Sequence, residues 1–288
     1  MPHYIYGFLM SMVLAYLTTP FVMKLAWKIG AIDVPKDARR VHKKPIPRLG
    51  GLAIYISFMV TGLLILPLEL PYVRGIFLGG SIIVILGILD DIYNLPAKVK
   101  LLGQLAAAGV LVLFGVKVEI LTNPLGGMII LGKLAIPATL FWVVGITNTL
   151  NFIDGLDGLA AGIAAIAAFT MMLVNLSLEQ ANGALVMALL AGAAIGFLPY
   201  NFNPAKIFMG DTGSMFLGFI LAAQAMEGMV KSATVIALIV PILALGLPIF
   251  DTVYAILRRF VHGKPIMQAD KGHVHHRLLA IGMSQKQA

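Results

Sequence analysis

The sequence predicts an all-α polytopic membrane protein, and its composition, its apolar runs and its charge distribution each support that prediction. Of the 288 residues, 59% are hydrophobic and 12% are charged, whereas a soluble domain carries about 25% charged residues. The chain contains no cysteine, which excludes disulfide frameworks, thiol nucleophiles and thiolate metal sites. We therefore expect residues 1–288 to form a single integral membrane domain.

Nine apolar stretches are candidates for membrane-spanning helices, because a bilayer core needs roughly 17–25 apolar residues per helix. The fifth and eighth are short, and Pro241 and Pro248 predict a kink or break in the ninth. Between the fourth and fifth, Lys117–Ala135 predicts a small outer β-hairpin. The nine stretches are Tyr4–Leu25, Gly51–Leu66, Val73–Leu89, Leu101–Val116, Ile136–Ile146, Leu159–Leu176, Gly183–Leu198, Ser214–Met226 and Ser232–Leu257.

The charged residues predict the orientation of these helices. With the N-terminus outside, most of the 21 lysines and arginines fall in inner loops, and the positive-inside rule makes that side cytoplasmic. The net charge of +8 follows from this topology, so we expect no nucleic-acid partner. Every aspartate also falls on the inner side and every glutamate on the outer side. Because the rule says little about acids, the one-sided aspartates predict an active site on the cytoplasmic loops.

Asp90 and Asp91 end the third span and are followed by Lys98 and Lys100. Adjacent helix positions point about 100° apart, so the two carboxylates need not share one ligand. Acids at a helix C-terminus oppose the helix dipole, which favours a functional interpretation over that of a solvated helix end.

A second motif, Asn148-x-x-Asn151-Phe152-Ile153-Asp154-Gly155-Leu156-Asp157-Gly158, is predicted in the loop between the fifth and sixth spans. Asp154 and Asp157 would share one face of a helical turn, and the glycines permit close backbone approach to a ligand. The alternative is that one aspartate only caps the sixth span.

The third motif runs from Asn201 to Ser214 and includes Phe208 and Asp211. Asp211 or Ser214 could simply cap the eighth span. A helix N-terminus is also a ready site for a phosphate group, because its free N–H groups point at the ligand.

Two basic motifs and one acid within a span complete the inner face. His273-x-His275-His276-Arg277 follows the ninth span, and Pro47-Arg48-Leu49-Gly50-Gly51 precedes the second. Each could be an ordinary basic patch or topology signal, although imidazole and guanidinium groups also suit phosphates. Asp251 lies within the apolar ninth span, where it is either functional or paired with Arg258 or Arg259.

The chemistry of these residue types favours phosphoryl transfer. Oxygen ligands without thiols favour Mg²⁺, with Mn²⁺ as the alternative, and Mg²⁺ near cationic side chains is typical of phosphoryl transfer. The chain has no Walker A sequence, which excludes a P-loop enzyme. A site at the level of the inner headgroups predicts an enzyme that joins a cytosolic nucleotide-activated donor to a lipid acceptor.

The five motifs, in this order, resemble those of the polyprenyl-phosphate N-acetylhexosamine-1-phosphate transferase family from about Val34 to Gly282. The first-loop motif and Asp270-Lys271-x-His273-x-His275-His276-Arg277-Leu278 look like its N-acetylglucosamine-1-phosphate branch, which starts teichoic acid, O-antigen and related polymers. The resemblance implies transfer from UDP-N-acetylglucosamine to undecaprenyl phosphate at the bacterial inner membrane, giving undecaprenyl-diphosphate-N-acetylglucosamine and UMP.

Two other functions are alternatives to this one. A sibling transferase could use another UDP-sugar, such as the phospho-MurNAc-pentapeptide donor. A transporter or flippase is not favoured, because transporters place polar groups near the bilayer midplane on repeated helices. Here the polar residues lie at inner helix ends, and no internal repeat is visible.

The resemblance also implies roles for single residues. Asp90 and Asp91 are expected to be catalytic and to face the lipid phosphate. Asp211 is expected to be catalytic and to bind Mg²⁺, with Asp154 as the second metal ligand. Asp251, Lys98 and Lys100 receive no definite role. The expected nucleotide- and substrate-binding residues are Lys43, Asn151, Gly155, Leu156, Asp157, Phe208, His273, His275, His276 and Arg277.

The resemblance also implies what to expect at the C-terminus of the chain and which partners it has. Family members usually continue beyond the His-Arg motif with one or two further spans, so we expect the last helices to be missing at the C-terminus. Membrane lipids are expected partners besides the two substrates, and a homodimer stays open.

Overall fold

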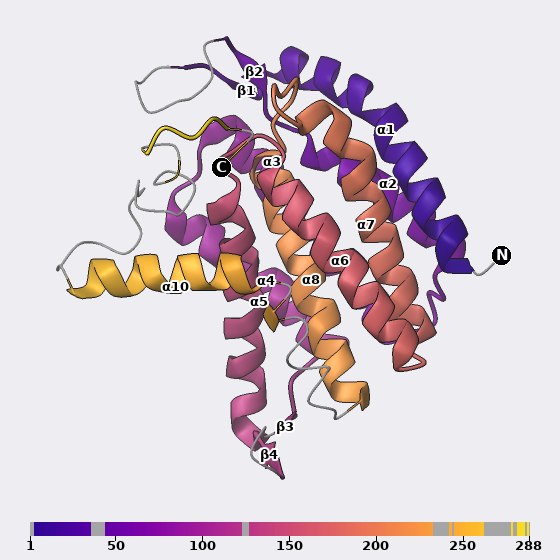
Figure 1. Cartoon of the computed structure of the whole chain (residues 1–288). Coiled ribbons are helices and arrows are strands. Elements are labelled where there is room, and N and C mark those ends of the chain that lie inside the picture. Colours follow the sequence, from indigo (N-terminus) through magenta and orange to yellow (C-terminus); the bar gives the residue numbers. More distant parts are fainter. Residues whose placement is uncertain are drawn as a thin grey trace.

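The computed structural model describes residues 3–35, 44–122, 127–232, 242–243, 245–261, 278, 281–285 and 287. These residues form a bundle of helices with two small antiparallel strand pairs (Figure 1). The helices are α1 His3–Ile29, α2 Gly51–Ile65, α3 Pro71–Tyr93, α4 Ala97–Leu113, α5 Ala135–Ile153, α6 Leu159–Ser177, α7 Ala181–Asn201, α8 Gly210–Ser232 and α10 Gly246–Val261, with the 3-10 turn η1 Gly132–Leu134 before α5. The strands are β1 Ile32–Asp33, β2 Ile46–Pro47, β3 Ile120–Thr122 and β4 Met128–Ile130.

Five helical segments in the described ranges are long and apolar enough to cross a bilayer, namely α1, α3, the segment Gly132–Ile153, α6 and α7. Helix α2 is apolar but shorter. Large apolar side chains cover the outside of the bundle; Phe141 and Leu113, for example, are 81% and 85% exposed. Such a surface suits lipid rather than water, so the chain is a membrane protein. The count of nine spans and their orientation stay predictions.

Helix α8 forms the centre of the bundle. It packs against α3 and α5, and also contacts α2, α6 and α7. Every side chain from Thr212 to Glu227 is buried, as expected for a helix that is apolar on all sides. Helix α1 packs against α7 at one edge, and α10 runs across the direction of the other helices and projects from the bundle (Figure 1).

The observed helices differ from the predicted spans by a few residues at most ends, and three of the differences bear on the polar motifs or on the last span. Helix α5 continues to Ile153, so Asn148 and Asn151 lie on its last turns and not in the predicted loop. Their side chains stay hydrogen-bonded to neighbouring helices, which removes the cost of burying them. Helix α8 begins at Gly210 rather than Ser214. Of the predicted ninth span, the structure describes α10, in which Pro248 falls in the first turn, where proline is tolerated.

Both strand pairs join segments near helix ends. The predicted hairpin between α4 and α5 is confirmed as β3–β4, with Ile120 opposite Ile130; its turn lies outside the described residues. The β1–β2 pair was not predicted, since two residues per strand leave no alternating pattern to detect. It sets Ile32 opposite Pro47 and so brings the first loop back to the end of α1.

Three helix ends meet at one point, here called the helix-end junction: the start of α2, the end of α3 and the start of α8. A Cβ atom on Gly51 would lie 2.0 Å from the backbone nitrogen of Gly213, and one on Gly87 would lie 2.4 Å from the Cα atom of Thr212. Only glycine allows backbones to approach this closely. The junction therefore depends on the absence of side chains at these positions.

Candidate active site at the helix-end junction

A cavity of 790 Å³ lies beside the helix-end junction. Asp91, Phe208, Asp211 and the turn Asp154–Asp157, predicted from three separate motifs, all line it. The structure thus brings these motifs together. Among the described residues, the lining consists of Trp27, Asp33, Lys44, Pro45, Ile46, Pro47, Arg48, Asp91, Asp154, Gly155, Leu156, Asp157, Asn201, Asn203, Pro204, Ala205, Lys206, Phe208, Gly210, Asp211 and Gln285.

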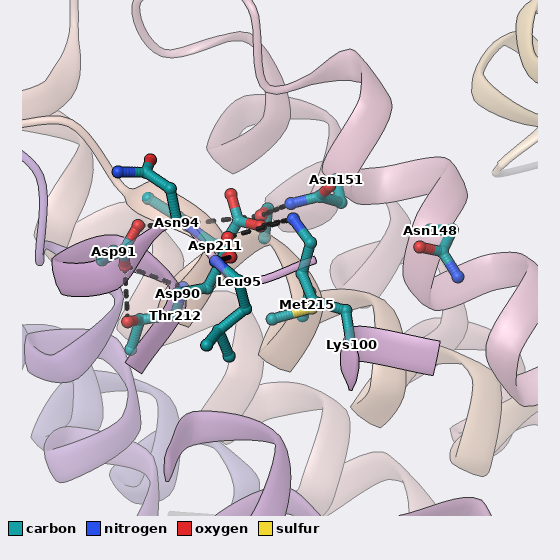
Figure 2. Close-up of polar contacts among 12 residues, drawn as sticks. Asp90, Asp91, Asn94, Leu95, Lys100, Asn148, Asn151, Asp211, Thr212 and Met215 are labelled. Atoms are coloured by element: carbon teal, nitrogen blue, oxygen red, sulfur yellow. Dashed lines mark hydrogen bonds and ion pairs between the residues drawn. The ribbon is translucent and has the colours of Figure 1, made fainter. Parts of the chain in front are cut away.

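The buried Asp91 carboxylate caps the start of α8 from the last turn of α3. Its Oδ1 accepts the backbone N–H of Asp211 at 3.0 Å, and its Oδ2 accepts the Thr212 N–H at 3.1 Å and the Thr212 hydroxyl at 2.6 Å. Free N–H groups at a helix start need acceptors, and a negative charge there is favourable. Asp91 therefore fixes the backbone of the first turn of α8, which carries Asp211 (Figure 2).

The neighbouring Asp90 points elsewhere, as the 100° step between adjacent helix positions predicts. It accepts the backbone N–H of Leu95 at 2.7 Å and the Lys100 ammonium at 3.0 Å. The same ammonium donates to Oδ2 of Asp211 at 2.9 Å. Figure 2 shows Lys100 reaching from α4 toward Asp211, so a cation from the chain itself lies between two predicted catalytic carboxylates.

Helix α5 approaches Asp211 from the other side. The Asn151 side chain donates to the Ser214 hydroxyl at 2.9 Å, and that hydroxyl donates to the Gly210 carbonyl at 3.1 Å. Asn148, one turn earlier, instead pairs with Gln104 of α4 at 2.8 Å. Of the two asparagines in the motif, Asn151 is thus the one next to the start of α8.

Asp154, in the α5–α6 loop, differs from Asp90 and Asp91 in its hydrogen bonding. Asp154 is half-buried and lines the cavity, yet within the described part of the chain its side chain has no hydrogen-bond partner. Burial raises the pKa of Asp154 well above its usual range, and the charges of Asp211, Asp91 and Asp157 raise it further. A carboxylate in this state gains strongly from a cation placed beside it.

Asp157, by contrast, holds the α7–α8 loop. Its Oδ2 accepts the Asn203 side-chain amide at 2.9 Å and the Ala205 backbone N–H at 3.0 Å. Asn201 secures the same loop, because it accepts the Gly158 N–H at 3.1 Å and donates to the Ile207 carbonyl at 3.0 Å. The second motif therefore shapes the cavity wall as well as lining it.

Arg48 is a cavity residue that the sequence prediction did not include among its site residues. Its Nε donates to the Asp91 carbonyl at 2.9 Å, and its Nη2 donates to Oδ1 of Asn94 at 2.8 Å. Asn94 ends α3 in the left-handed conformation, with φ at 52°. Arg48 thus binds the end of the helix that carries both aspartates. The Pro-Arg-Leu-Gly-Gly motif was the signal for it.

The other predicted residues lie away from these contacts. Lys98 is exposed and makes no hydrogen bond or ion pair to a described residue, and Asp251 is buried in α10 and does not line the cavity. Lys43 and the cluster His273, His275, His276 and Arg277 lie outside the described residues. Basic groups on the cavity wall come instead from Lys44, Arg48 and Lys206.

The donor atoms at the cavity fit a divalent cation that is only partly bound by protein. Among the described residues, no group of three or more His, Cys, Asp or Glu side chains could hold a metal ion. Mg²⁺ usually keeps several waters and binds through one or two carboxylates together with substrate phosphates. Asp154, which makes no hydrogen bond to a described residue, and Asp211, whose side chain is 26% exposed, present oxygens of that kind to the cavity.

Comparison with known proteins agrees with the motifs. Residues 73–229 match the family described as glycosyl transferase family 4. A probable undecaprenyl-phosphate N-acetylglucosaminyl 1-phosphate transferase of Bacillus subtilis (strain 168) is 44% identical over 282 residues, which is 97% of this chain and 78% of that protein. A decaprenyl-phosphate N-acetylglucosaminephosphotransferase of Mycolicibacterium smegmatis is 38% identical over 97% of this chain and 76% of its own length.

A more distant relative belongs to the sibling type. A phospho-N-acetylmuramoyl-pentapeptide-transferase of Bacillus thuringiensis (strain Al Hakam) is 32% identical over 94% of this chain and 87% of its own length. The resemblance that the motifs indicated is confirmed, and the chain belongs to glycosyl transferase family 4.

Proposed function

We propose that this chain transfers N-acetylglucosamine-1-phosphate from UDP-N-acetylglucosamine to undecaprenyl phosphate, giving undecaprenyl-diphosphate-N-acetylglucosamine and UMP. The observation that carries the proposal is the meeting of Asp211, the turn Asp154–Asp157 and three basic side chains at one cavity of 790 Å³. The relatives with N-acetylglucosamine in their names are also more similar to this chain than the pentapeptide-transferase, at 44% and 38% against 32% identity.

The donor occupies the cavity in this proposal. Gly155, Leu156, Asp157 and Phe208, which line the cavity, surround the nucleotide, and Asn151 supports the site from beside the start of α8. Lys44, Arg48 and Lys206 line the same cavity, and their positive charges suit a diphosphate. By the family resemblance, Lys43 and the cluster His273, His275, His276 and Arg277 add contacts to the nucleotide, the sugar and the diphosphate.

Asp211 and Asp154 are the residues that would hold Mg²⁺, or Mn²⁺ in its place. When bound, the ion supplies positive charge that offsets the negative charge of the reacting phosphates. Asp91 keeps Asp211 in place through the cap of α8, and Asp90 positions Lys100 beside Asp211. The three aspartates proposed as catalytic therefore have different tasks.

The reaction is an exchange of one phosphorus–oxygen bond for another. An oxygen of the lipid phosphate forms a bond to the phosphorus that carries the sugar, and the bond from that phosphorus to the bridging oxygen breaks, so that UMP leaves with the electron pair. A phosphate monoester has a second pKa of about 6 and is mostly dianionic at pH 7. Positioning and charge compensation therefore matter more than a strong base.

The site is proposed to face the cytoplasm, at a bacterial inner membrane, where a soluble UDP-sugar and a lipid phosphate can both reach it. The one-sided distribution of basic residues and aspartates supports this orientation.

An assay with purified protein, undecaprenyl phosphate and a panel of radiolabelled UDP-sugars tests the proposal. We expect a labelled lipid product and stoichiometric UMP from UDP-N-acetylglucosamine in the presence of Mg²⁺. A label transferred only from the phospho-MurNAc-pentapeptide donor would show the sibling activity instead. Initial rates at varied donor and acceptor concentrations should be sequential; ping-pong kinetics with a phosphorylated aspartate would support a covalent route.

A further inference from the structure

Lys100 has an unusual position for a lysine near a cation site. Its ammonium lies 2.9 Å from Oδ2 of Asp211 and 3.0 Å from Oδ2 of Asp90. The side chains of Lys100, Asp90 and Asp211 are 27%, 9% and 26% exposed, respectively. The ammonium therefore occupies a partly buried place between two carboxylates, where charge interactions are stronger than at a fully exposed surface.

In this position the Lys100 ammonium competes with a divalent cation for the Asp211 carboxylate. Two positive charges on one carboxylate repel each other, and the ammonium already neutralises part of the negative charge that would attract the ion. Lys100 can leave Asp211 only by giving up a hydrogen bond between charged groups, which is among the strong hydrogen bonds in proteins. Both effects make binding of a free cation less favourable.

We infer that Lys100 keeps the affinity of this site for a free divalent cation low, so that the cation binds together with the diphosphate of the donor. The diphosphate brings enough negative charge to accommodate the cation and the ammonium side by side. Cation and donor then strengthen each other's binding by the same factor. The inference rests on the proposed function for the identity of the donor, but not for the effect of Lys100 on the cation.

Titration of the purified protein with Mn²⁺ in the absence of donor, followed by the electron paramagnetic resonance signal of free Mn²⁺, tests the inference without measuring activity. We expect Lys100→Gln and Lys100→Met to bind Mn²⁺ at least tenfold more tightly than the wild type. Asp211→Asn introduced into the Lys100→Gln protein should remove the gained site.

Two matched variants serve as controls. Lys98→Gln removes a lysine of the same helix turn that is exposed and makes no hydrogen bond or ion pair to a described residue, so it should bind Mn²⁺ like the wild type. Lys100→Arg keeps the positive charge and should also bind weakly. Equal or weaker Mn²⁺ binding by both neutral Lys100 variants would overturn the inference, as would tenfold tighter binding by Lys100→Arg.

Thermal unfolding in detergent gives a second readout and shows which variants fold. In EDTA, Lys100→Gln should melt below the wild type, because Asp90 and Asp211 lose their shared cation; with Mn²⁺ it should gain more in Tm than the wild type does. An equal gain would contradict the inference. Failure of the proposed function would appear separately, as wrong donor specificity with the Mn²⁺ results unchanged.

Discussion

The two acid-bearing regions of the cavity differ in how their carboxylates are satisfied. At the helix-end junction, Asp91 accepts hydrogen bonds from Asp211 and Thr212, and Asp90 accepts them from Leu95 and Lys100. In the α5–α6 loop, Asp154 accepts none from any described residue. A buried carboxylate that is fully paired stabilises its surroundings, whereas an unpaired one costs free energy.

This difference distinguishes carboxylates that hold the fold together from a carboxylate that is available to bind a ligand. At the junction Asp91 and Asp211 both line the cavity, but both oxygens of Asp91 already accept hydrogen bonds from the start of α8. The loop keeps Asp154 in an unfavourable state that a bound cation would relieve. The protein therefore gives up some stability at the loop, where function needs an available ligand, and recovers stability at the junction.

Asp211 lies at the junction and also lines the cavity, so its replacement tests the comparison most severely. We expect Asp211→Asn to lower the rate of transfer by about a thousandfold, as for removal of a group that stabilises the charge of a transition state. UMP release measures the rate. Circular dichroism should show unchanged helix content. Transfer that survives this substitution would refute the assignment of the metal ligand.

Asp91→Ala tests whether the Asp91 carboxylate stabilises the helix-end junction. The substitution leaves the Asp211 and Thr212 donors of α8 without their acceptor, so we expect a loss of about 3 kcal/mol of stability. Thermal unfolding in a fixed detergent measures it. Asp91→Asn should lose less, because the amide oxygen can still accept. Wild-type stability in the alanine variant would show that the cap does not hold the junction.

Asp154→Asn should lower activity but not stability. We expect the rate of transfer to fall by about a hundredfold. The stability in EDTA should equal or exceed that of the wild type. The raised folded-state pKa of Asp154 means that its contribution to stability is present only at low pH and is lost as pH rises through that pKa. At pH 7 the neutral amide therefore relieves a cost. A large drop in Tm would show that Asp154 stabilises the fold as Asp91 does, and would contradict the proposed difference between the two regions.

Arg48→Lys should have the smallest effect of the four. Lysine keeps the charge but cannot reach both the Asp91 carbonyl and the Asn94 side chain, since that contact uses two nitrogens of one planar group. We expect about a tenfold loss of rate, because the end of α3 that carries Asp90 and Asp91 is then positioned less well. The loss should appear in kcat with Tm nearly unchanged; a change confined to KM would mean that Arg48 acts on the donor alone.

The sequence predicted most of the helices and three of the motifs that line the cavity, those of Asp91, Asp154–Asp157 and Asp211, for identifiable reasons. Long apolar runs mark α1, α3, α6 and α7 without reference to their neighbours. Helix ends were less predictable, because Asn148 and Asn151 look like loop residues until Gln104 and Ser214 are seen to satisfy them. Polar residues inside a bundle depend on contacts far away in the chain.

The division of work among the acids could not be predicted. Nothing in the spacing of Asp90 and Asp91 shows that one caps α8 and the other binds a lysine. Likewise, Lys98 and Lys100 are equivalent in sequence, and only the rotation of α4 selects Lys100 for contact with Asp211. Helix packing determines these pairings, and a single sequence does not encode it locally.

The glycines of the helix-end junction have a consequence for anyone who engineers this protein. Exchanging glycine for alanine in helices is a common route to thermostable variants, worth about 0.5–1 kcal/mol per site. That route is closed at Gly51, Gly87 and Gly213, where an added methyl group would collide with backbone. It is open at Gly145 and Gly162, whose surroundings are empty within 4 Å. Stabilising libraries should therefore include Gly145 and Gly162 and leave the glycines at the ends of α2, α3 and α8 untouched.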